Sequence, residues 1–446
     1  MHETLQLAEH VSRLRYEDVP APLMEELKVL TLDYLGVALR GSLTDSARIV
    51  AEFQAEYGAA RTEATIIGTG ARVSAQSAAF ANAVAAHSIE LDDVDDLALF
   101  HFSPPVLSAA LAAAEAAGLS GKGYLLAAAA GSEVMARVSN AANPVMRDRG
   151  FHSTATCGVF GAAAAAARVE GLSPEQVASS FGIAGAHAAG LMEMYGPSMQ
   201  KRINPGPAAQ NGVVAARLAR RGYTGADTIF EGERGVLKAF TGGGDPQALV
   251  DGLGTEYPVR IEYKAYACAR PIHNAVDCAL GLRGQVAGRL PEIRELTIYR
   301  HPAWAHYHQI RSPRSHHEAQ VSLNHAVAVA LVEGAAFLDQ FQEEFIALPE
   351  VQRLSCMLKF EADPGLPRGV SCNLRVTLDS GESFEAQVDY PKGSLQNPMT
   401  PEDHWRKFLS LAGARFPASR LEAIRDAVAH LEDLAGIGEL TALLAG

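Results

Sequence analysis

The sequence has little of what marks secreted, membrane-spanning or zinc-binding proteins. Its five cysteines are widely spaced among 446 residues and form no CxxC pair, which is typical of reduced thiols and not of a disulfide framework or a structural zinc site. No apolar run approaches the roughly 18 uninterrupted residues of a membrane span. The first residues contain no basic stretch followed by an apolar one, so we expect a cytoplasmic protein without a membrane partner.

Positive charge is also scarce. The chain has 38 Lys and Arg against 51 Asp and Glu, a formal net charge of -13, which argues against nucleic acid as a partner. Neither a P-loop nor a GxGxxG motif after a strand is present, so we expect no organic cofactor. With 48% hydrophobic residues, the chain is long enough to form two or three globular domains.

Residues 1 to about 262 are patterned almost entirely for helices. Apolar residues recur at three-to-four spacing over residues 23–35, 74–88, 107–117, 124–141 and 158–170. Alanine occupies every side of several of these stretches, including 109–117 and 162–167. Small residues all round indicate either helices that pack closely in a buried bundle or a face shared by two subunits.

From about residue 290 the apolar period changes to two. This pattern predicts strands at 292–299, 354–360, 372–378 and 384–390, with a helix over 318–333 and a hairpin turn at Asp379-Ser-Gly-Glu382. We therefore predict a mainly α protein. A large all-α helical domain is formed by residues 1–262 plus 393–446, and a smaller α+β lid domain with an antiparallel sheet by residues 263–392.

The densest group of polar chemistry is His87-Ser-Ile-Glu-Leu-Asp-Asp-Val-Asp-Asp96, followed at once by His101. Carboxylates and imidazoles are costly to bury without partners. The block is compatible with a metal site, a proton-transfer site or a solvated acidic turn. Because no HxxxH or comparable spacing supports a complete ligand set, we predict no metal.

Further clusters combine polar side chains with glycine and proline. His152 precedes an Ala-rich helix, whose N-terminus favours neutral imidazole able to accept a proton; a packing or capping histidine is the alternative. Lys201 and Arg202 precede another Ala-rich helix, where the two cations and the amides of the helix N-terminus could bind an anion together. The alternative is an ordinary surface loop. Lys264 and His273 lie at the expected domain junction, a usual place for ligand clefts.

With these clusters placed in order, the chain resembles the MmgE/PrpD family over nearly its whole length. The matching blocks are Leu32-Asp-Tyr-Leu-Gly36, Ala86-His-Ser-Ile-Glu-Leu-Asp-Asp93, Gly150-Phe-His152, Met199-Gln-Lys201 with Gly206 to Gln210, Gly222-Tyr-Thr-Gly225, Phe230-Glu-Gly232 and Ile272-His273. The resemblance implies a large all-α domain with an α+β lid, a homodimer, and chemistry on di- and tricarboxylates. Family members include 2-methylcitrate dehydratase, cis-aconitate decarboxylase and iminodisuccinate epimerase.

The resemblance also implies the site residues. We predict that the catalytic residues are Lys201, His101, His152, Tyr307 and Asp93, and that the substrate-binding residues are Glu90, Asp92, Arg202, Lys264 and His273. Lys201 and Lys264 suit the charge that develops on carboxylate oxygens when a neighbouring α-proton moves.

Four positions depart from the family pattern, namely Val94, Phe102, Asn204 and Ala269. They replace polar or proline residues, and so remove groups that a dehydratase would use on a leaving hydroxyl. We therefore predict an isomerase, a cofactor-independent epimerase that moves the α-proton of a dicarboxylate such as iminodisuccinate between two bases. The alternative is a lyase, either a hydro-lyase or a decarboxylase acting on a tricarboxylate.

Overall fold

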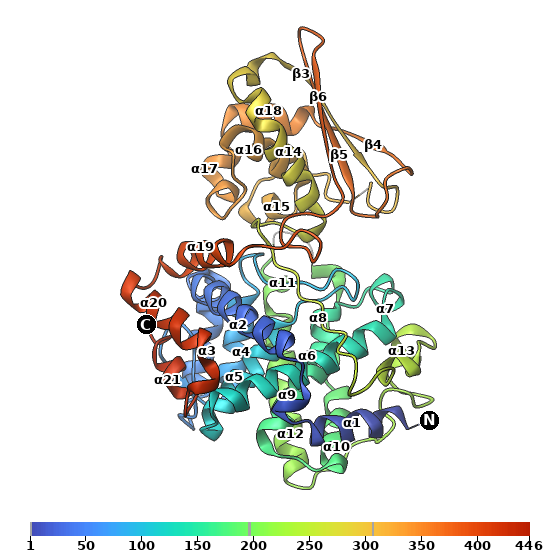
Figure 1. Ribbon diagram of the computed structural model, residues 1–446, viewed down its shortest axis with the longest axis vertical. Coiled ribbons are helices and arrows are strands. Elements are labelled where there is room, and N and C mark those ends of the chain that lie inside the picture. Colours follow the sequence, from blue (N-terminus) through green and yellow to red (C-terminus); the bar gives the residue numbers. More distant parts are fainter. Residues whose placement is uncertain (1, 195–197, 306) are drawn as a thin grey trace. The chain divides into compact units, whose positions relative to one another are not determined.

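The computed structural model describes residues 2–194, 198–305 and 307–446. Helices make up 57% of the structure and strands 8%, which confirms the predicted mainly α class with a smaller sheet-containing part. By their internal contacts the residues form two units. Unit 1 comprises residues up to Ile261 together with Pro401–Gly446, and unit 2 comprises Glu262–Thr400 (Figure 1).

Unit 1 is helical except for a two-stranded ribbon of β1 (Ala64–Thr65) and β2 (Arg72–Val73). Its helices are α1 (Glu3–Arg13), α2 (Ala21–Gly41), α3 (Asp45–Tyr57), α4 (Ala75–Ala86), α5 (Ser108–Ala117), α6 (Gly121–Ala142), α7 (Val145–Asp148), α8 (Ser153–Thr156), α9 (Gly158–Glu170), α10 (Pro174–Gly185), α11 (Gln200–Ile203), α12 (Pro205–Arg220), α13 (Val236–Thr241), α19 (Pro401–Ala412), α20 (Ala418–Ala429) and α21 (Gly438–Ala442). The five helices predicted from the apolar period are α2, α4, α5, α6 and α9.

The centre of unit 1 is the Ala-rich helix α9, which packs against α5, α6, α10 and α12. Its alanines at 162–166 are 0% exposed. The approach is so close that a Cβ added at Gly212 of α12 would lie 2.4 Å from the Cβ of Ala162. Of the two explanations for this alanine-rich face, the structure supports burial within the chain.

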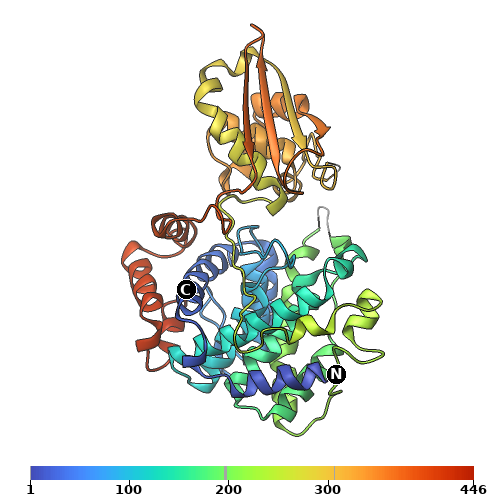
Figure 2. The ribbon, with the colours of Figure 1, turned by 45° about the vertical axis from the view of Figure 1, so that its right-hand side comes forward.

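The C-terminal helices of unit 1 return to its N-terminal helices, as the red and blue ribbons of Figure 2 show. Helix α19 packs against α2, and Lys407 of α19 forms a buried 2.7 Å ion pair with Asp33 of α2. Lys407 Nζ also donates a 2.7 Å hydrogen bond to the carbonyl oxygen of Leu91. The C-terminal segment therefore holds the acidic block that follows α4.

Unit 2 has a four-stranded sheet in the order β4-β3-β5-β6, formed by β3 (Ile293–Arg300), β4 (Lys359–Ala362), β5 (Cys372–Leu378) and β6 (Ser383–Val388). The helices are α14 (His273–Val286), α15 (His316–Gln320), α16 (Leu323–Glu333), α17 (Glu343–Ile346) and α18 (Pro349–Met357). Leu374, Val376 and Leu378 of β5 are all buried, and α14 packs on β5 and β6. The predicted hairpin is the β5–β6 pair.

Three details of unit 2 differ from the sequence prediction. Residues 354–357 belong to α18 and not to a strand, because Pro349 begins a helix whose Val351 and Leu354 share its buried face. The predicted helix 318–333 is broken, since the hydroxyl of Ser322 accepts from His325 N–H and begins a new helix. The sheet is mixed, because β4 pairs with β3 in parallel.

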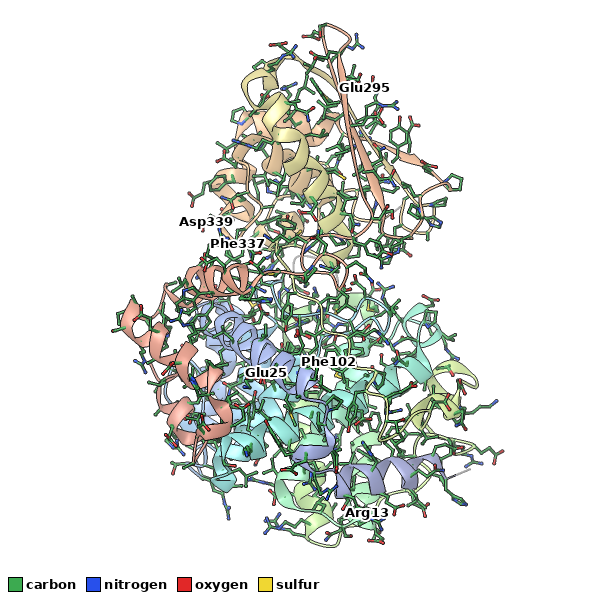
Figure 3. The ribbon with its side chains drawn as sticks, viewed as in Figure 1. Arg13, Glu25, Phe102, Glu295, Phe337 and Asp339 are labelled. Atoms are coloured by element: carbon green, nitrogen blue, oxygen red, sulfur yellow. The ribbon has the colours of Figure 1, made fainter. Side chains whose placement is uncertain are left out.

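The side chains of unit 1 divide clearly between interior and surface. Phe102 is 0% exposed, whereas the side chain of Arg13 on α1 is 72% exposed (Figure 3).

None of the helices in the described part of the chain combines the length and apolar character of a membrane-spanning segment.

Candidate functional site

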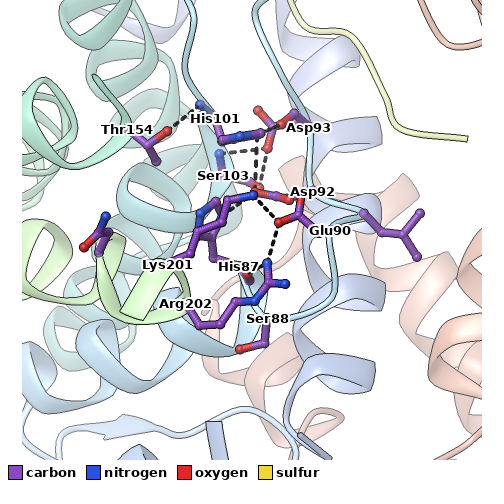
Figure 4. A network of polar contacts seen from close by, with 12 residues as sticks. His87, Ser88, Glu90, Asp92, Asp93, His101, Ser103, Thr154, Lys201 and Arg202 are labelled. Carbon is purple, nitrogen blue, oxygen red and sulfur yellow. Dashed lines mark hydrogen bonds and ion pairs between the residues drawn. The ribbon is translucent and has the colours of Figure 1, made fainter. Parts of the chain in front are cut away.

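The acidic block forms a buried loop between α4 and α5 in unit 1 (Figure 4). Helix α4 ends at Ala86 and His87 is its C-cap. The loop then leads to a π-helical turn, η2 (Ser103–Leu107), which continues into α5. Glu90, Asp92, Asp93 and Asp95 are at most 1% exposed, so the block is not a solvated turn.

Asp93 anchors the far end of this loop. Its carboxylate accepts hydrogen bonds from Phe102 N–H at 2.7 Å, Ser103 N–H at 3.0 Å and the Ser103 hydroxyl at 2.5 Å. Burial raises the pKa of Asp93 to about 7, the charge of Asp92 adds to the rise, and the three donors oppose it. Both oxygens are engaged with the backbone or side chain at the start of η2, which makes Asp93 an organiser of the loop.

Asp92 lies between two imidazoles. Its Oδ2 is 2.6 Å from His87 Nδ1 and 3.3 Å from His101 Nδ1. The rings of His87 and His101 meet edge to face with centroids 5.1 Å apart. Burial lowers the pKa of His87, against the opposing effect of Asp92, so the ring is neutral at neutral pH and donates its Nδ1 hydrogen to the carboxylate.

His101 is held so that one ring nitrogen has a defined role. Its Nδ1 contacts the carbonyl oxygen of Asp93, which only accepts hydrogen bonds, so Nδ1 carries hydrogen. The backbone N–H of His101 donates a hydrogen bond to the hydroxyl of Thr154 at 3.2 Å. The side chain is 13% exposed. In the neutral ring Nε2 therefore carries no hydrogen, and it is the nitrogen that gains or loses a proton when the ring titrates.

His152 has the opposite tautomer. It precedes α8 as N-cap and is 6% exposed. The amide nitrogen of Asn204 donates to its Nδ1 at 3.1 Å, so neutral His152 carries its hydrogen on Nε2. Burial is the main cause that lowers its pKa well below the usual value, followed by His87 and His101. The neutral ring expected from the sequence is present, but burial and neighbouring groups are its cause.

Lys201 and Arg202 lie on α11 and both contact Glu90. Arg202 Nη1 is 2.5 Å from Glu90 Oε1, and Lys201 Nζ contacts the same oxygen. The three side chains have formal charges of +1, +1 and -1 and keep one net positive charge. Glu90 has a positive φ of 58°, a strained conformation for a residue with a side chain. The two cations hold it there and provide positive charge beside both histidines.

One group of three donors is compact enough to be compared with a metal site. Ring nitrogens of His87 and His101 and an oxygen of Asp92 lie within 4.8 Å of one another. His87 and His101 each donate an Nδ1 hydrogen to an acceptor oxygen of the loop, so these groups are held together by hydrogen bonds. We therefore treat them as a hydrogen-bonded network and not as ligands.

Three predicted site residues belong to unit 2. Lys264 is 1% exposed. His273 is fully buried and its Nε2 donates to the Cys268 carbonyl at 3.2 Å. Tyr307 is 58% exposed, and its ring lies 5.2 Å from that of Trp304. Their assignment to the site stays a prediction.

Sequence reasoning did not assign a role to several residues that hold this network. His87 stands inside the acidic motif and Ser103 lies two residues after His101, so their spacing from Asp92 and Asp93 was the available signal. Asn204 was noted only as a departure from the family pattern. Lys407 gave no signal, since its contact with the loop joins residues 316 positions apart.

Comparison with known proteins decides the family. Residues 5–249 match the MmgE/PrpD N-terminal domain, and residues 266–433 match the MmgE/PrpD C-terminal domain. The chain belongs to the MmgE/PrpD family. The resemblance inferred from seven short motifs is thereby confirmed.

The MmgE/PrpD relatives that match this chain along its length include cis-aconitate decarboxylases. The cis-aconitate decarboxylase-like protein oryM of Aspergillus oryzae is 30% identical over 480 aligned positions, which cover 99% of this chain and 97% of the relative. Cis-aconitate decarboxylase of Aspergillus terreus is 29% identical, with 99% and 95% covered. The human cis-aconitate decarboxylase is 29% identical, with 95% and 90% covered.

These relatives correct the predicted activity. The predictions of an isomerase, of an epimerase and of iminodisuccinate as substrate are wrong, because the curated relatives of this MmgE/PrpD chain are decarboxylases, which are lyases. The error has a chemical cause. Loss of polar groups at Val94 and Ala269 argues against an acid for a leaving hydroxyl, but decarboxylation has no leaving hydroxyl either.

Proposed function

We propose that this protein is a decarboxylase of an unsaturated tricarboxylate, with cis-aconitate as its substrate. The observation that carries the proposal is one buried cluster in which two imidazoles of opposite tautomer lie around His87 and two cations pair with Glu90. The names of the full-length relatives support the same reaction. A tricarboxylate also suits the site chemically, because cations and N–H donors bind its oxygens.

The reaction needs one proton and no oxidant. In cis-aconitate one carboxymethyl carbon is attached to the C=C bond. When the bond from that carbon to its carboxylate breaks, the electron pair forms a new C=C bond and the old one moves its pair to the far alkene carbon. That carbon takes a proton, and the products are carbon dioxide and methylenesuccinate. The enzyme must therefore supply a proton donor and stabilise the carboxylates that remain.

His101 is the proposed proton donor. Its Nδ1 hydrogen faces the Asp93 carbonyl and Asp92, which leaves Nε2 to deliver a proton to carbon. Asp92 stabilises the charged ring before the transfer, and the ring returns to its neutral form afterwards. Because the side chain is partly exposed, a substrate can reach it.

Lys201, Arg202 and His152 are the proposed carboxylate-binding groups. Glu90 fixes both cations through one oxygen, so they are oriented before substrate arrives, which reduces reorganisation in the transition state. His152 remains neutral and presents an Nε2 hydrogen. It donates a hydrogen bond without adding a further charge.

The test is direct observation of the products. Purified protein with cis-aconitate in deuterium oxide and a chelator should release carbon dioxide and give methylenesuccinate with one deuterium on its saturated CH2 carbon, which was the alkene C–H of the substrate. Proton NMR follows the reaction. Hydration without gas release would indicate a hydro-lyase and contradict the proposal. His101→Gln is the matched variant, and we expect its turnover to fall by about 10²–10⁴-fold.

Lys264, His273 and Tyr307 complete the proposed set of site residues. Lys264→Met and Tyr307→Phe should each lower kcat/KM at least about tenfold, since each removes one proposed hydrogen-bond donor to the substrate. Circular dichroism melting checks that unit 2 remains folded. Unchanged kinetics in either variant would remove that residue from the site.

We also propose that the protein is a homodimer, formed through α3. Ile49, Phe53 and Tyr57 recur at four-residue spacing on this helix and are 50%, 55% and 68% exposed. Helix α11, whose Ile203 is 40% exposed, packs against α3. Large apolar side chains that are exposed on neighbouring helices in this way are typical of a protein interface. The second copy is its proposed occupant.

Light scattering after gel filtration tests the dimer. The wild-type protein should have twice the 47.3 kDa chain mass, and Phe53→Glu should reduce this to one chain. Tyr223→Glu is the control, because Tyr223 is also 64% exposed but lies outside α3. Dissociation by both variants, or by neither, would contradict an interface at α3.

A cytoplasmic location is the last part of this proposal. The five cysteines, all among the described residues, form no disulfide with one another, and four are buried, as expected where thiols are kept reduced. Cell fractionation with an antibody to the native protein tests the location.

A further inference from the structure

We propose that His87 is a positioning residue, which holds Asp92 against His101 and thereby sets how firmly His101 keeps its proton. The proposal rests on the proposed function in one respect, that His101 is the group that delivers the proton. None of the comparisons assigns a role to His87.

His87 is buried, so its side chain does not serve to keep the surface of the protein polar. It caps the C-terminus of α4, its ring is 1% exposed, and its carbonyl oxygen accepts a hydrogen bond from Arg202. The groups that face the ring from the neighbouring segments are Asp92, Glu90, His101, His152 and Lys201. The residue therefore lies between the acidic loop, α8 and α11.

Two imidazoles compete for the same oxygen of Asp92. His87 Nδ1 lies 2.6 Å from Oδ2, and His101 Nδ1 lies 3.3 Å from it. The shorter bond directs much of the carboxylate charge to His87. Because a nearby negative charge stabilises the protonated form of an imidazole, this division weakens the hold of Asp92 on the His101 proton and makes His101 a better acid.

The other ring nitrogen of His87 supports a functional role. Nε2 is buried and has no hydrogen-bond partner among the described residues. An asparagine could donate the same hydrogen bond to Asp92 from this place, so the hydrogen bond alone does not explain a histidine. Burial of an unpaired acceptor such as Nε2 opposes folding. A flat ring there also packs against His101 and His152, with centroid separations of 5.1 and 5.9 Å.

Two substitutions distinguish the roles of the two ring nitrogens of His87. In His87→Asn the side-chain amide nitrogen takes the place of Nδ1 and keeps the donor to Asp92, whereas His87→Gln reaches only the place of Nε2 and loses that donor. Both variants are polar and similar in size. A structural role of the ring would be lost in both, and the Asp92 bond only in His87→Gln.

We expect different pH profiles. In His87→Gln the full charge of Asp92 acts on His101, so the alkaline limb of the kcat/KM profile should move up by about one pH unit. Turnover at neutral pH should fall by about 10- to 100-fold, as is typical when a group that orients an active-site side chain is lost. His87→Asn should restore most of the activity and the wild-type profile.

Nitrogen NMR of the histidines gives a readout that does not depend on the substrate. With His101→Gln to assign the signal, wild-type His101 should carry its neutral hydrogen on Nδ1, and its titration midpoint should rise in His87→Gln but not in His87→Asn. Equal kinetic losses in both variants with an unmoved titration would overturn the proposal, as would full activity of His87→Gln. If the wild-type protein released no carbon dioxide, the proposed function would fail while this titration still decided the role of His87.

Discussion

At the scale of single residues, the site shows how a few hydrogen bonds assign chemistry to side chains of the same type. His101 and His152 are both imidazoles close to His87, yet a carbonyl acceptor fixes the first with hydrogen on Nδ1 and an amide donor fixes the second with hydrogen on Nε2. One is thereby suited to move a proton and the other to donate a hydrogen bond.

Lys201 should be needed for activity and not for folding. In Lys201→Met, Arg202 still pairs with Glu90, so no buried carboxylate loses every partner, and the thermal midpoint should change by less than about 2 °C. Turnover should fall by roughly 10²–10³-fold through loss of one cation at the carboxylates. Steady-state kinetics and calorimetry measure both quantities.

Lys238→Met is the control for Lys201, because Lys238 is an exposed lysine whose Nζ donates a hydrogen bond to the Gly242 carbonyl oxygen. It should keep wild-type kinetics. A matched loss of stability and activity in Lys201→Met would make Lys201 structural.

Asp93 should make stability depend on pH. The native chain keeps its proton up to about pH 7, whereas the unfolded chain loses it near 4. Between these values the native state binds more protons, so the unfolding free energy falls as pH rises, by up to about 4 kcal/mol. Asp93→Asn cannot titrate, and its melting temperature should fall less steeply from pH 4.5 to 7.5. Parallel curves for the two proteins would show that Asp93 is not the source.

At the scale of elements, alanine and glycine allow the helices of unit 1 to approach closely. Helix α9 is enclosed by four others and has no large polar residue among 158–167. The close packing matters for the site, because α4, α9 and α12 bring the loop after α4, the start of α8 and the residues of α11 into one region.

Gly212→Ala should therefore destabilise unit 1. The new Cβ would lie 2.4 Å from the Cβ of Ala162 and 2.6 Å from its carbonyl carbon, so α9 and α12 would have to separate at a cost of about 1–3 kcal/mol. We expect a melting temperature lower by roughly 3 °C or more. Gly438→Ala on α21 is the control, since nothing lies within 4 Å of its added Cβ, and it should melt within about 2 °C of the wild type. Equal melting of both variants would contradict close packing at α12.

At the scale of the whole molecule, the chain leaves unit 1 after Ile261 and returns at Pro401. The predicted folding domains have slightly different limits, 1–262 plus 393–446 and 263–392. Brief digestion with a protease of low specificity should cut near 262 and between 389 and 400, in the segments that link the two. The outer fragments should stay together, because α19 packs on α2. Mass spectrometry of the fragments tests this, and early cuts within 263–392 would contradict a second domain that folds as one unit.

Much of the fold was predictable because it depends on local patterns. The three-to-four apolar period of α2, α4 and α6 and the alternation in β5 follow from which side chains must face a core. The strand predicted at 354–360 is wrong over 354–357 for the same local reason, since a short apolar run suits either element and Pro349 begins a helix there, while 359 and 360 do lie in β4.

The sequence by itself determined the family, the helical class and which residue types gather around 87–103, because motifs and periods are local properties of a chain. Only the tertiary structure decided that the acids are buried, that Asp92 serves both His87 and His101, and that Asn204 orients His152. Lys407 meets the loop across 316 residues of chain. Such contacts depend on how distant helices pack, and neither spacing nor composition records that packing.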